Sequence, residues 1–213
     1  MASVLDSFSE GFRLTSRHFG LLALPAFLVI LMQGFIWYLE FLVENAFSLI
    51  LFVPAVLVGF FAAAANVWLF SRALAIVTGS DHPFRWSAAL ALYGYLLIAS
   101  AIVVVINVVF ALLLPVSGVG IFGVFLLWQA ILAFFYVRFF WFVAEVASDD
   151  REEGAFSRSW QLSSGHFFSI VGFTLLSSMI LLAGLVALGI GVFFALPMIV
   201  VSSVHYYESL RSE

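Results

Sequence analysis

Long apolar runs with very few charges between them limit this chain to one kind of environment. Of its 213 residues, 65% are hydrophobic and only 9% are charged, and the mean hydropathy is +1.20. A soluble domain carries about 25% charged residues, because its surface must face water. The charges are too few to cover such a surface, so the composition predicts an all-α integral membrane protein whose surface mostly faces lipid or partner protein.

The apolar runs predict six transmembrane helices, arranged as three hairpins. A helix needs about 20 apolar residues to cross roughly 30 Å of hydrocarbon, and the first four runs cover residues 19–43, 46–78, 92–114 and 119–146. The last run, residues 167–207, would be about 60 Å long as one helix at 1.5 Å per residue, twice the bilayer thickness. It is expected to turn at ALGIG, residues 187–191, because glycine tolerates the backbone angles of a tight reversal.

The basic residues predict how these helices are oriented. All eight are arginine. With the amino terminus inside the cell, every one falls on the cytoplasmic side: Arg13, Arg17, Arg72, Arg85, Arg138, Arg151, Arg158 and Arg211. Because positive residues are retained on that side, we expect both termini in the cytoplasm and a multi-pass protein of the cytoplasmic (inner) membrane of a prokaryote. A five-helix arrangement would place Arg211 outside and fits this rule less well.

Two polar segments of the sequence resemble each other. The first segment, residues 8–19, is FSEGFRLTSRHF, and the second, residues 156–167, is FSRSWQLSSGHF; they are identical at six of twelve positions. A looser copy, WSAALAL, begins at Trp86. Each copy precedes a pair of apolar runs. The pattern predicts one domain, residues 1–213, built from repeats at 1–79, 80–147 and 148–213. The alternative is chance matching in a sequence of low diversity.

Each repeated segment is expected to form an amphipathic helix at the cytoplasmic surface, ahead of its hairpin. In the third copy, Phe156 and Trp160 are four residues apart and share a helix face, with Arg158 turned away from it. Such helices lie in the headgroup plane with their apolar face toward lipid. The alternative is that the aromatic side chains, among them Phe8 and Phe12 of the first copy, are buried between transmembrane helices.

Three segments also carry a resemblance to known proteins: SRALAIVTGSDHPFRWSAAL (71–90), RSWQLSSGHFFSIVGF (158–173) and LAGLVALGIGVFFALPMIVVSSVHYYESLR (182–211). They resemble a bacterial membrane-domain family whose members occur fused to glycerophosphodiester phosphodiesterases and as stand-alone membrane proteins of unknown function. The resemblance implies a six-helix membrane fold. It implies no activity, because the phosphodiesterase chemistry of the fused members belongs to their soluble domain.

The first candidate site is a cytoplasmic rim made of the eight arginines and Trp160, which we expect to engage anionic lipid or a membrane protein partner. A charge at the bilayer centre is costly. Near a helix end, however, arginine extends its guanidinium to the headgroups, and we expect this structural or lipid-phosphate role for Arg72 and Arg138. Glu145 is seven residues after Arg138 and could join it in a polar cluster.

The second candidate site is a pair of histidines. His18 and His166 are equivalent in the repeat, and facing each other they could hold a haem, a chlorophyll or a metal through their imidazoles. No two histidines have the spacing of local metal ligands on one helix, and histidine is ordinary at an interface, so no cofactor is expected. Cysteine is absent, which excludes disulfides and thiolate metal sites.

The sequence favours a non-catalytic protein, an accessory or structural subunit, since it carries no nucleophile set, phosphate loop or metalloprotease motif. The expected partners are membrane lipids, a membrane protein complex or further copies of the chain; nucleic acid is not expected, because no lysine-rich patch exists. One alternative is a small transporter or flippase for lipid-like or amphiphilic molecules, with Asn66, Asn107 and Gln129 lining its cavity. A second is a haem- or pigment-associated subunit of an electron-transfer complex.

Overall fold

All regular secondary structure in the described part of the chain is helical, which confirms the predicted all-α class. The computed structural model describes residues 3–46, 52–113, 134, 141–148, 154–187, 189 and 191–212. These residues form α1 (Val4–Ala46), α2 (Phe52–Thr78), α3 (Trp86–Leu113), α5 (Phe142–Ser148), α6 (Ala155–Gly165), α7 (Phe167–Val186) and α8 (Val192–Arg211).

Three of these helices are long and apolar enough to cross a membrane: α1 over Val4–Leu39, α2 over Val56–Thr78, and α7. A helix of about 20 residues is roughly 30 Å long, the thickness of the hydrocarbon core. The fourth predicted helix, residues 119–146, lies largely outside the described residues, and its last residues belong to α5. The described residues thus support a membrane protein.

The predicted turn in the last apolar run is confirmed. Residues 167–207 form two helices, α7 and α8, which pack against each other. Gly189 has a φ of +74°, a left-handed backbone that favours glycine. A Cβ on Gly184 would lie 2.9 Å from the carbonyl carbon of Gly191, so the two helices approach closely where neither residue has a side chain.

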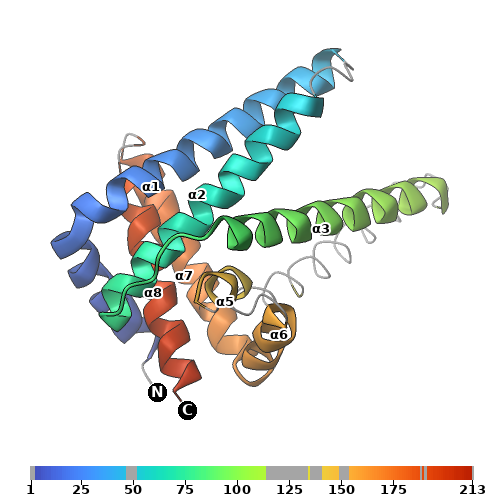
Figure 1. Ribbon diagram of the computed structural model, residues 1–213. Coiled ribbons are helices and arrows are strands. Elements are labelled where there is room, and N and C mark those ends of the chain that lie inside the picture. The colour runs from blue at the N-terminus through green and yellow to red at the C-terminus, as the bar shows by residue number, and fades with distance from the viewer. Residues whose placement is uncertain are drawn as a thin grey trace.

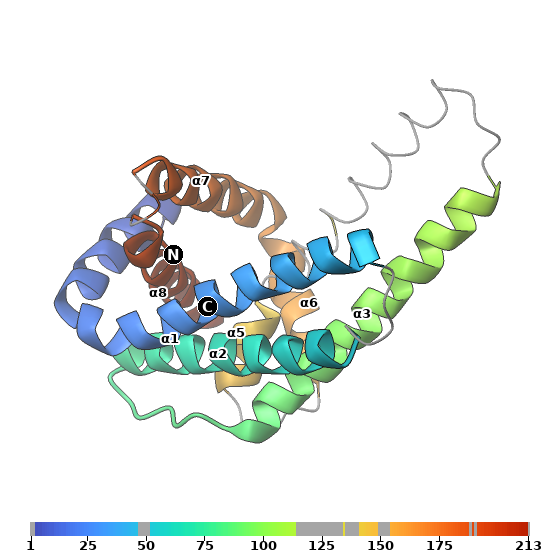
Figure 2. The same cartoon turned by 90° about the horizontal axis from the view of Figure 1, so that it is seen from above.

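The helices pack around α8, which contacts α1, α2 and α7. Figure 1 shows that both termini, the loop at residues 79–85 and α6 lie at one end of the molecule, the polar end. The far ends of α1 and α3 and the α7–α8 turn point the other way. Figure 2 shows α3 leaning away from the other helices, and its middle turns, residues 95–102, are exposed on every side.

An aromatic core fills the polar end of the fold. Trp141, Phe173, Tyr206 and Tyr207 are buried together, and the Phe173 and Tyr206 rings stack with their centroids 5.7 Å apart. Phe8 joins them, with its ring stacked 4.6 Å from that of Phe173. This core brings the amino-terminal turns of α1, the start of α7 and the end of α8 into contact.

The predicted amphipathic segments take three different forms. The first copy is the start of α1, up to a kink at His18 (φ −117°, ψ 21°), and it packs along α8: a Cβ on Gly11 would lie 2.9 Å from the Cα of Ser202. Phe8 is buried in protein, as the alternative expected, whereas Phe12 is exposed and the alternative is wrong for that residue. The physical reason is that small residues on both helices allow close approach.

The middle copy contradicts the expectation of a separate helix. Residues 86–92 are the first turns of α3, which continues without a break to Leu113. The third copy does form a separate helix, α6, which ends at His166 (φ −125°, ψ 24°) before α7 begins. Its buried residues are Ala155, Ser159 and Ser163, so α6 is packed most closely through its face of small residues. Phe156 is exposed, and the half-buried Trp160 contacts Phe134.

Candidate functional site

A buried carboxylate marks the polar end of the fold. Among the described residues, Glu145 is the only charged side chain in the buried set, with 2% of its surface exposed. It lies on the short helix α5, directly after the buried Trp141. An ionised carboxylate that loses water without gaining partners is costly, so the contacts around Glu145 decide how this region holds together.

Two other helices supply those contacts. Arg158 of α6 donates from Nε to Oε2 of Glu145 at 2.8 Å. Tyr207 of α8 donates its hydroxyl proton to Oε1 at 2.9 Å. Both carboxylate oxygens are thus engaged, one by a cation and one by a neutral donor. The cluster of Glu145, Arg158 and Tyr207, here called the carboxylate cluster, joins α5, α6 and α8.

Tyr207 is suited to donate. It lies in the last turns of α8 and is buried. A tyrosine hydroxyl keeps its proton at neutral pH, so it can donate to the carboxylate. The hydroxyl of Ser148 lies 3.5 Å from that of Tyr207 and donates to the backbone carbonyl of Glu145 at 3.2 Å.

The loop between α2 and α3 is tied to the same region. Arg85 donates from Nη2 to the backbone carbonyl of Val146 at 3.0 Å. The last carbonyls of a helix have no partner within it, and an arginine at this end satisfies one of them and suits the helix dipole. A second arginine of the predicted rim therefore has a structural contact beside Glu145.

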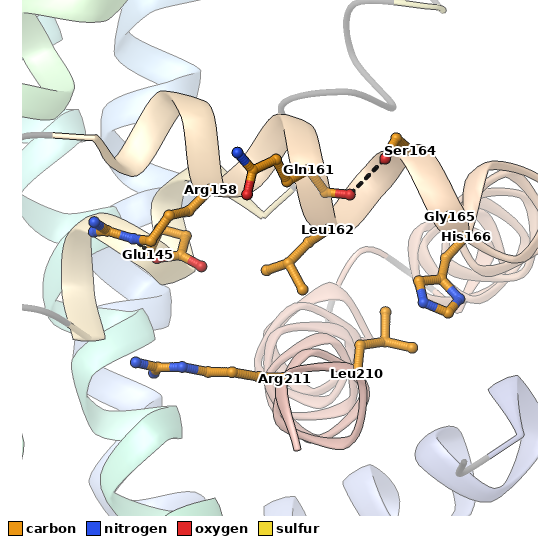
Figure 3. A pocket seen from close by; sticks show the side chains of 9 residues that line it. All are labelled: Glu145, Arg158, Gln161, Leu162, Ser164, Gly165, His166, Leu210 and Arg211. Carbon is orange, nitrogen blue, oxygen red and sulfur yellow. Dashed lines mark hydrogen bonds and ion pairs between the residues drawn. The ribbon is translucent and has the colours of Figure 1, made fainter. Parts of the chain in front are cut away.

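A cavity of about 450 Å³ opens beside the carboxylate cluster (Figure 3). Its lining comes from α5, α6, α8 and the α6–α7 junction: Glu145, Arg158, Gln161, Leu162, Ser164, Gly165, His166, Leu210 and Arg211. Figure 3 shows Arg158 and Arg211 reaching to the same side, with Leu162 and Leu210 between them and His166. The cavity therefore has a cationic side and an apolar wall.

Both arginines of the cavity are partly open to solvent. The side chain of Arg158 is 35% exposed and that of Arg211 is 49% exposed. The Arg211 guanidinium lies 6.0 Å from the centre of the Tyr207 ring and 4.0 Å from a carboxylate oxygen of Glu208. Each guanidinium thus has a carboxylate beside it, Glu145 for Arg158 and Glu208 for Arg211, while part of each arginine side chain stays open at the cavity.

No family model, no curated protein and no solved structure matches the chain. The function of this site is therefore inferred from its own geometry and from the sequence. The chemistry available is a pair of guanidiniums beside an apolar wall, which suits the binding of an anion with an apolar part.

The structure separates the predicted rim into groups. Arg158 and Arg211 line the cavity, and Trp160 lies on the same helix as Arg158, with its ring 6.1 Å from that of Phe134. Arg13 pairs with Glu10 on α1. Arg17 and Arg72 are exposed, and Arg138 and Arg151 lie outside the described residues.

The sequence suggested that Glu145 could join Arg138 in a polar cluster, and Arg138 lies outside the described residues. Among the described residues, Arg158 donates from Nε to Glu145 at 2.8 Å. The contact with Tyr207 was not predicted from the sequence. One signal was available: Glu145 is the lone carboxylate in a long apolar run, so a buried Glu145 requires a cation and a further donor from elsewhere in the fold.

The two candidate histidines occupy different surroundings. His18 lies at the kink of α1, and His166 lies between α6 and α7, where it lines the cavity. The described residues contain no group of three or more histidine, aspartate or glutamate side chains that could hold a metal ion. The pairing of His18 with His166 stays a prediction.

The polar residues assigned to a transport cavity are described only in part. Asn66 donates from its side chain to the carbonyl of Ala62 at 2.8 Å, within its own helix. Asn107 and Gln129 have side chains outside the described residues. The contact of Asn66 is one that a residue of a packed helix makes without a cavity.

Proposed function

We propose that this chain is a non-catalytic, multi-pass protein of a prokaryotic cytoplasmic membrane, an accessory or structural subunit whose arginine-rich end engages anionic lipid or a membrane protein partner. It has six transmembrane helices in three hairpins, with both termini in the cytoplasm. Three helices of sufficient length and apolarity support the membrane assignment. The proposal extends the family resemblance of residues 71–90, 158–173 and 182–211, which no family model matches.

The observation that carries the proposal is the gathering of arginine-bearing segments at one end of an apolar body. The start of α1, the loop at residues 79–85, α6 and the end of α8 lie together at the polar end (Figure 1). Positively charged residues are retained on the cytoplasmic side when a membrane protein is inserted, and the anionic headgroups of the cytoplasmic leaflet attract arginine.

The apolar surface supports the membrane assignment. Large apolar side chains are exposed along α1, α3 and α7, among them Trp37, Leu96, Ile98, Phe168 and Val186. Exposed apolar area costs about 25 cal/mol per Å² in water, so a surface of this kind is stable only against lipid or a partner.

The carboxylate cluster favours a structural role over catalysis. A general base must reach a substrate proton within hydrogen-bonding distance. Glu145 is 2% exposed, and both of its oxygens already accept from Arg158 and Tyr207. A carboxylate enclosed in this way holds helices together and is not accessible to a substrate.

The test is the lipid that leaves the membrane with the protein. Purification in a neutral detergent, followed by lipid extraction and mass spectrometry, should show anionic phospholipid enriched over its fraction in the source membrane. A variant with Arg13, Arg17 and Arg211 changed to Gln should lose most of this enrichment. Wild-type protein with the lipid composition of the bulk membrane and with no co-purifying membrane protein would contradict the proposal.

A further inference from the structure

We propose that the cavity between α6 and α8 binds the phosphate of an anionic lipid headgroup, with Arg158 and Arg211 as the binding side chains. The inference rests on the proposed function, because it assigns lipid engagement at the polar end to one cavity. It adds a chemical class of ligand, a phosphate ester, and two positioning residues, Glu145 and Tyr207.

The two arginines come from helices that are distant in sequence and line the same cavity. Arg158 lies on α6 and Arg211 on the last turn of α8, and both line the cavity of about 450 Å³. Arginine binds phosphate through planar, paired N–H groups and keeps its charge at any physiological pH. The volume falls in the range of small-molecule sites, about 300–1,000 Å³.

Glu145 and Tyr207 act as positioning residues. The carboxylate holds Nε of Arg158 at 2.8 Å, which fixes the plane of that guanidinium against α5. Tyr207 holds the carboxylate from its other oxygen at 2.9 Å and places its ring beside Arg211, 6.0 Å from the guanidinium carbon. The cluster therefore holds Arg158 directly and places the Tyr207 ring beside Arg211.

Among the described residues, two carboxylates lie near the arginines of the cavity. Glu145 is enclosed and pairs with Arg158. Glu208 lies 4.0 Å from Arg211, with both side chains partly exposed, and solvent weakens such a surface pair. A phosphate ester, with up to two negative charges, displaces Glu208 from Arg211 at small cost.

The apolar wall selects a lipid over free phosphate. Leu162 and Leu210 line the cavity beside the arginines, and inorganic phosphate has no group to place against them. His166 of the cavity directly precedes α7, whose Phe168 is 86% exposed. Leu175 and Met179 are also exposed, at seven and eleven residues after Phe168 on nearly the same helix face. This exposed apolar face of α7 would contact an acyl chain of the bound lipid.

The experiment measures ligand binding by thermal stability of the purified protein in neutral detergent. Short-chain phosphatidic acid, diacylglycerol of the same chain length and inorganic phosphate are titrated separately. Phosphatidic acid should raise the unfolding temperature with a saturable curve, and diacylglycerol should leave it unchanged. Inorganic phosphate should bind at least tenfold more weakly. Equal affinity for inorganic phosphate and phosphatidic acid would overturn the lipid assignment.

The variants locate the site. Arg211→Gln, an exposed position that should fold normally, is expected to weaken phosphatidic acid binding at least tenfold, and Arg158→Lys, which keeps the charge but loses the planar pair, by a similar factor. Arg72→Gln, an exposed arginine of α2 outside the cavity lining, is the matched control and should bind like wild type. Wild-type affinity in both cavity variants would overturn the inference.

The two proposals fail differently. If anionic lipid co-purifies equally with wild type and with Arg211→Gln, the cavity is not the site, although the arginine-rich end still engages lipid. If wild type retains no anionic lipid and phosphatidic acid gives no shift, lipid engagement and the cavity assignment both fall.

Discussion

Glu145 and Arg158 form an ion pair of 2.8 Å between α5 and α6, and only the arginine reaches solvent. The pair is asymmetric: the carboxylate is enclosed and the guanidinium is 35% exposed at the wall of a cavity. Removing the arginine should therefore destabilise the fold more than removing the carboxylate. An unpaired buried carboxylate costs far more free energy than an unpaired exposed arginine.

Arg158→Met should destabilise the fold by about 2 kcal/mol. Breaking a fully buried pair costs roughly 3–5 kcal/mol, and the partial exposure of Arg158 lowers this figure. Chemical unfolding in detergent, followed by tryptophan fluorescence, measures the change. Arg17→Met, an exposed arginine of α1, is the control and should stay within about 0.5 kcal/mol of wild type. Equal stability of the two variants would mean that the pair contributes nothing.

Tyr207→Phe should cost about 1–3 kcal/mol, because Oε1 of Glu145 then has no donor in the cluster while the aromatic packing is kept. The same unfolding assay applies. Tyr38→Phe, on an exposed part of α1, removes a hydroxyl without this contact and should be nearly neutral. If Tyr207→Phe is as stable as Tyr38→Phe, the hydroxyl is not a partner of the carboxylate.

Gly11→Ala should destabilise the contact between α1 and α8 by about 1–3 kcal/mol, the range for overpacking. The new Cβ would lie 2.9 Å from the Cα of Ser202, so the helices must move apart. Gly20→Ala is the matched control on the same helix, since nothing lies within 4 Å of its Cβ position. The control should stabilise by up to about 1 kcal/mol through helix propensity; destabilisation of the same size in both would contradict the packing argument.

The positions of several helices could be predicted from the sequence, because helix formation depends on residues that are close together in the chain. The apolar runs predicted α2, α3 and the division of residues 167–207 at a glycine turn, because helix length and hydropathy are local properties. The contact of Glu145 with Tyr207 joins residues 62 positions apart. Such a contact depends on how helices pack, which periodicity in one segment cannot predict, so the sequence supplied the carboxylate but not its partners.

The repeat remains a prediction, with one new observation in its favour. Three pairs of equivalent positions are buried in the first and third copies: Ser7 and Ala155, Gly11 and Ser159, and Thr15 and Ser163. The helix breaks at the equivalent histidines, His18 and His166, with similar backbone angles. In both copies the small residues between the aromatic positions are buried, since close packing of helices needs small side chains.

Cysteine labelling of intact cells tests the central claim that the arginine-rich end faces the cytoplasm. The chain contains no cysteine, so Ser157→Cys on α6 and Leu188→Cys in the α7–α8 connection each give a single site. An impermeant maleimide should label the Leu188→Cys variant in intact cells and the Ser157→Cys variant only after permeabilisation. Labelling of the Ser157→Cys variant from outside intact cells would place α6 and its arginine on the exterior and contradict the claim.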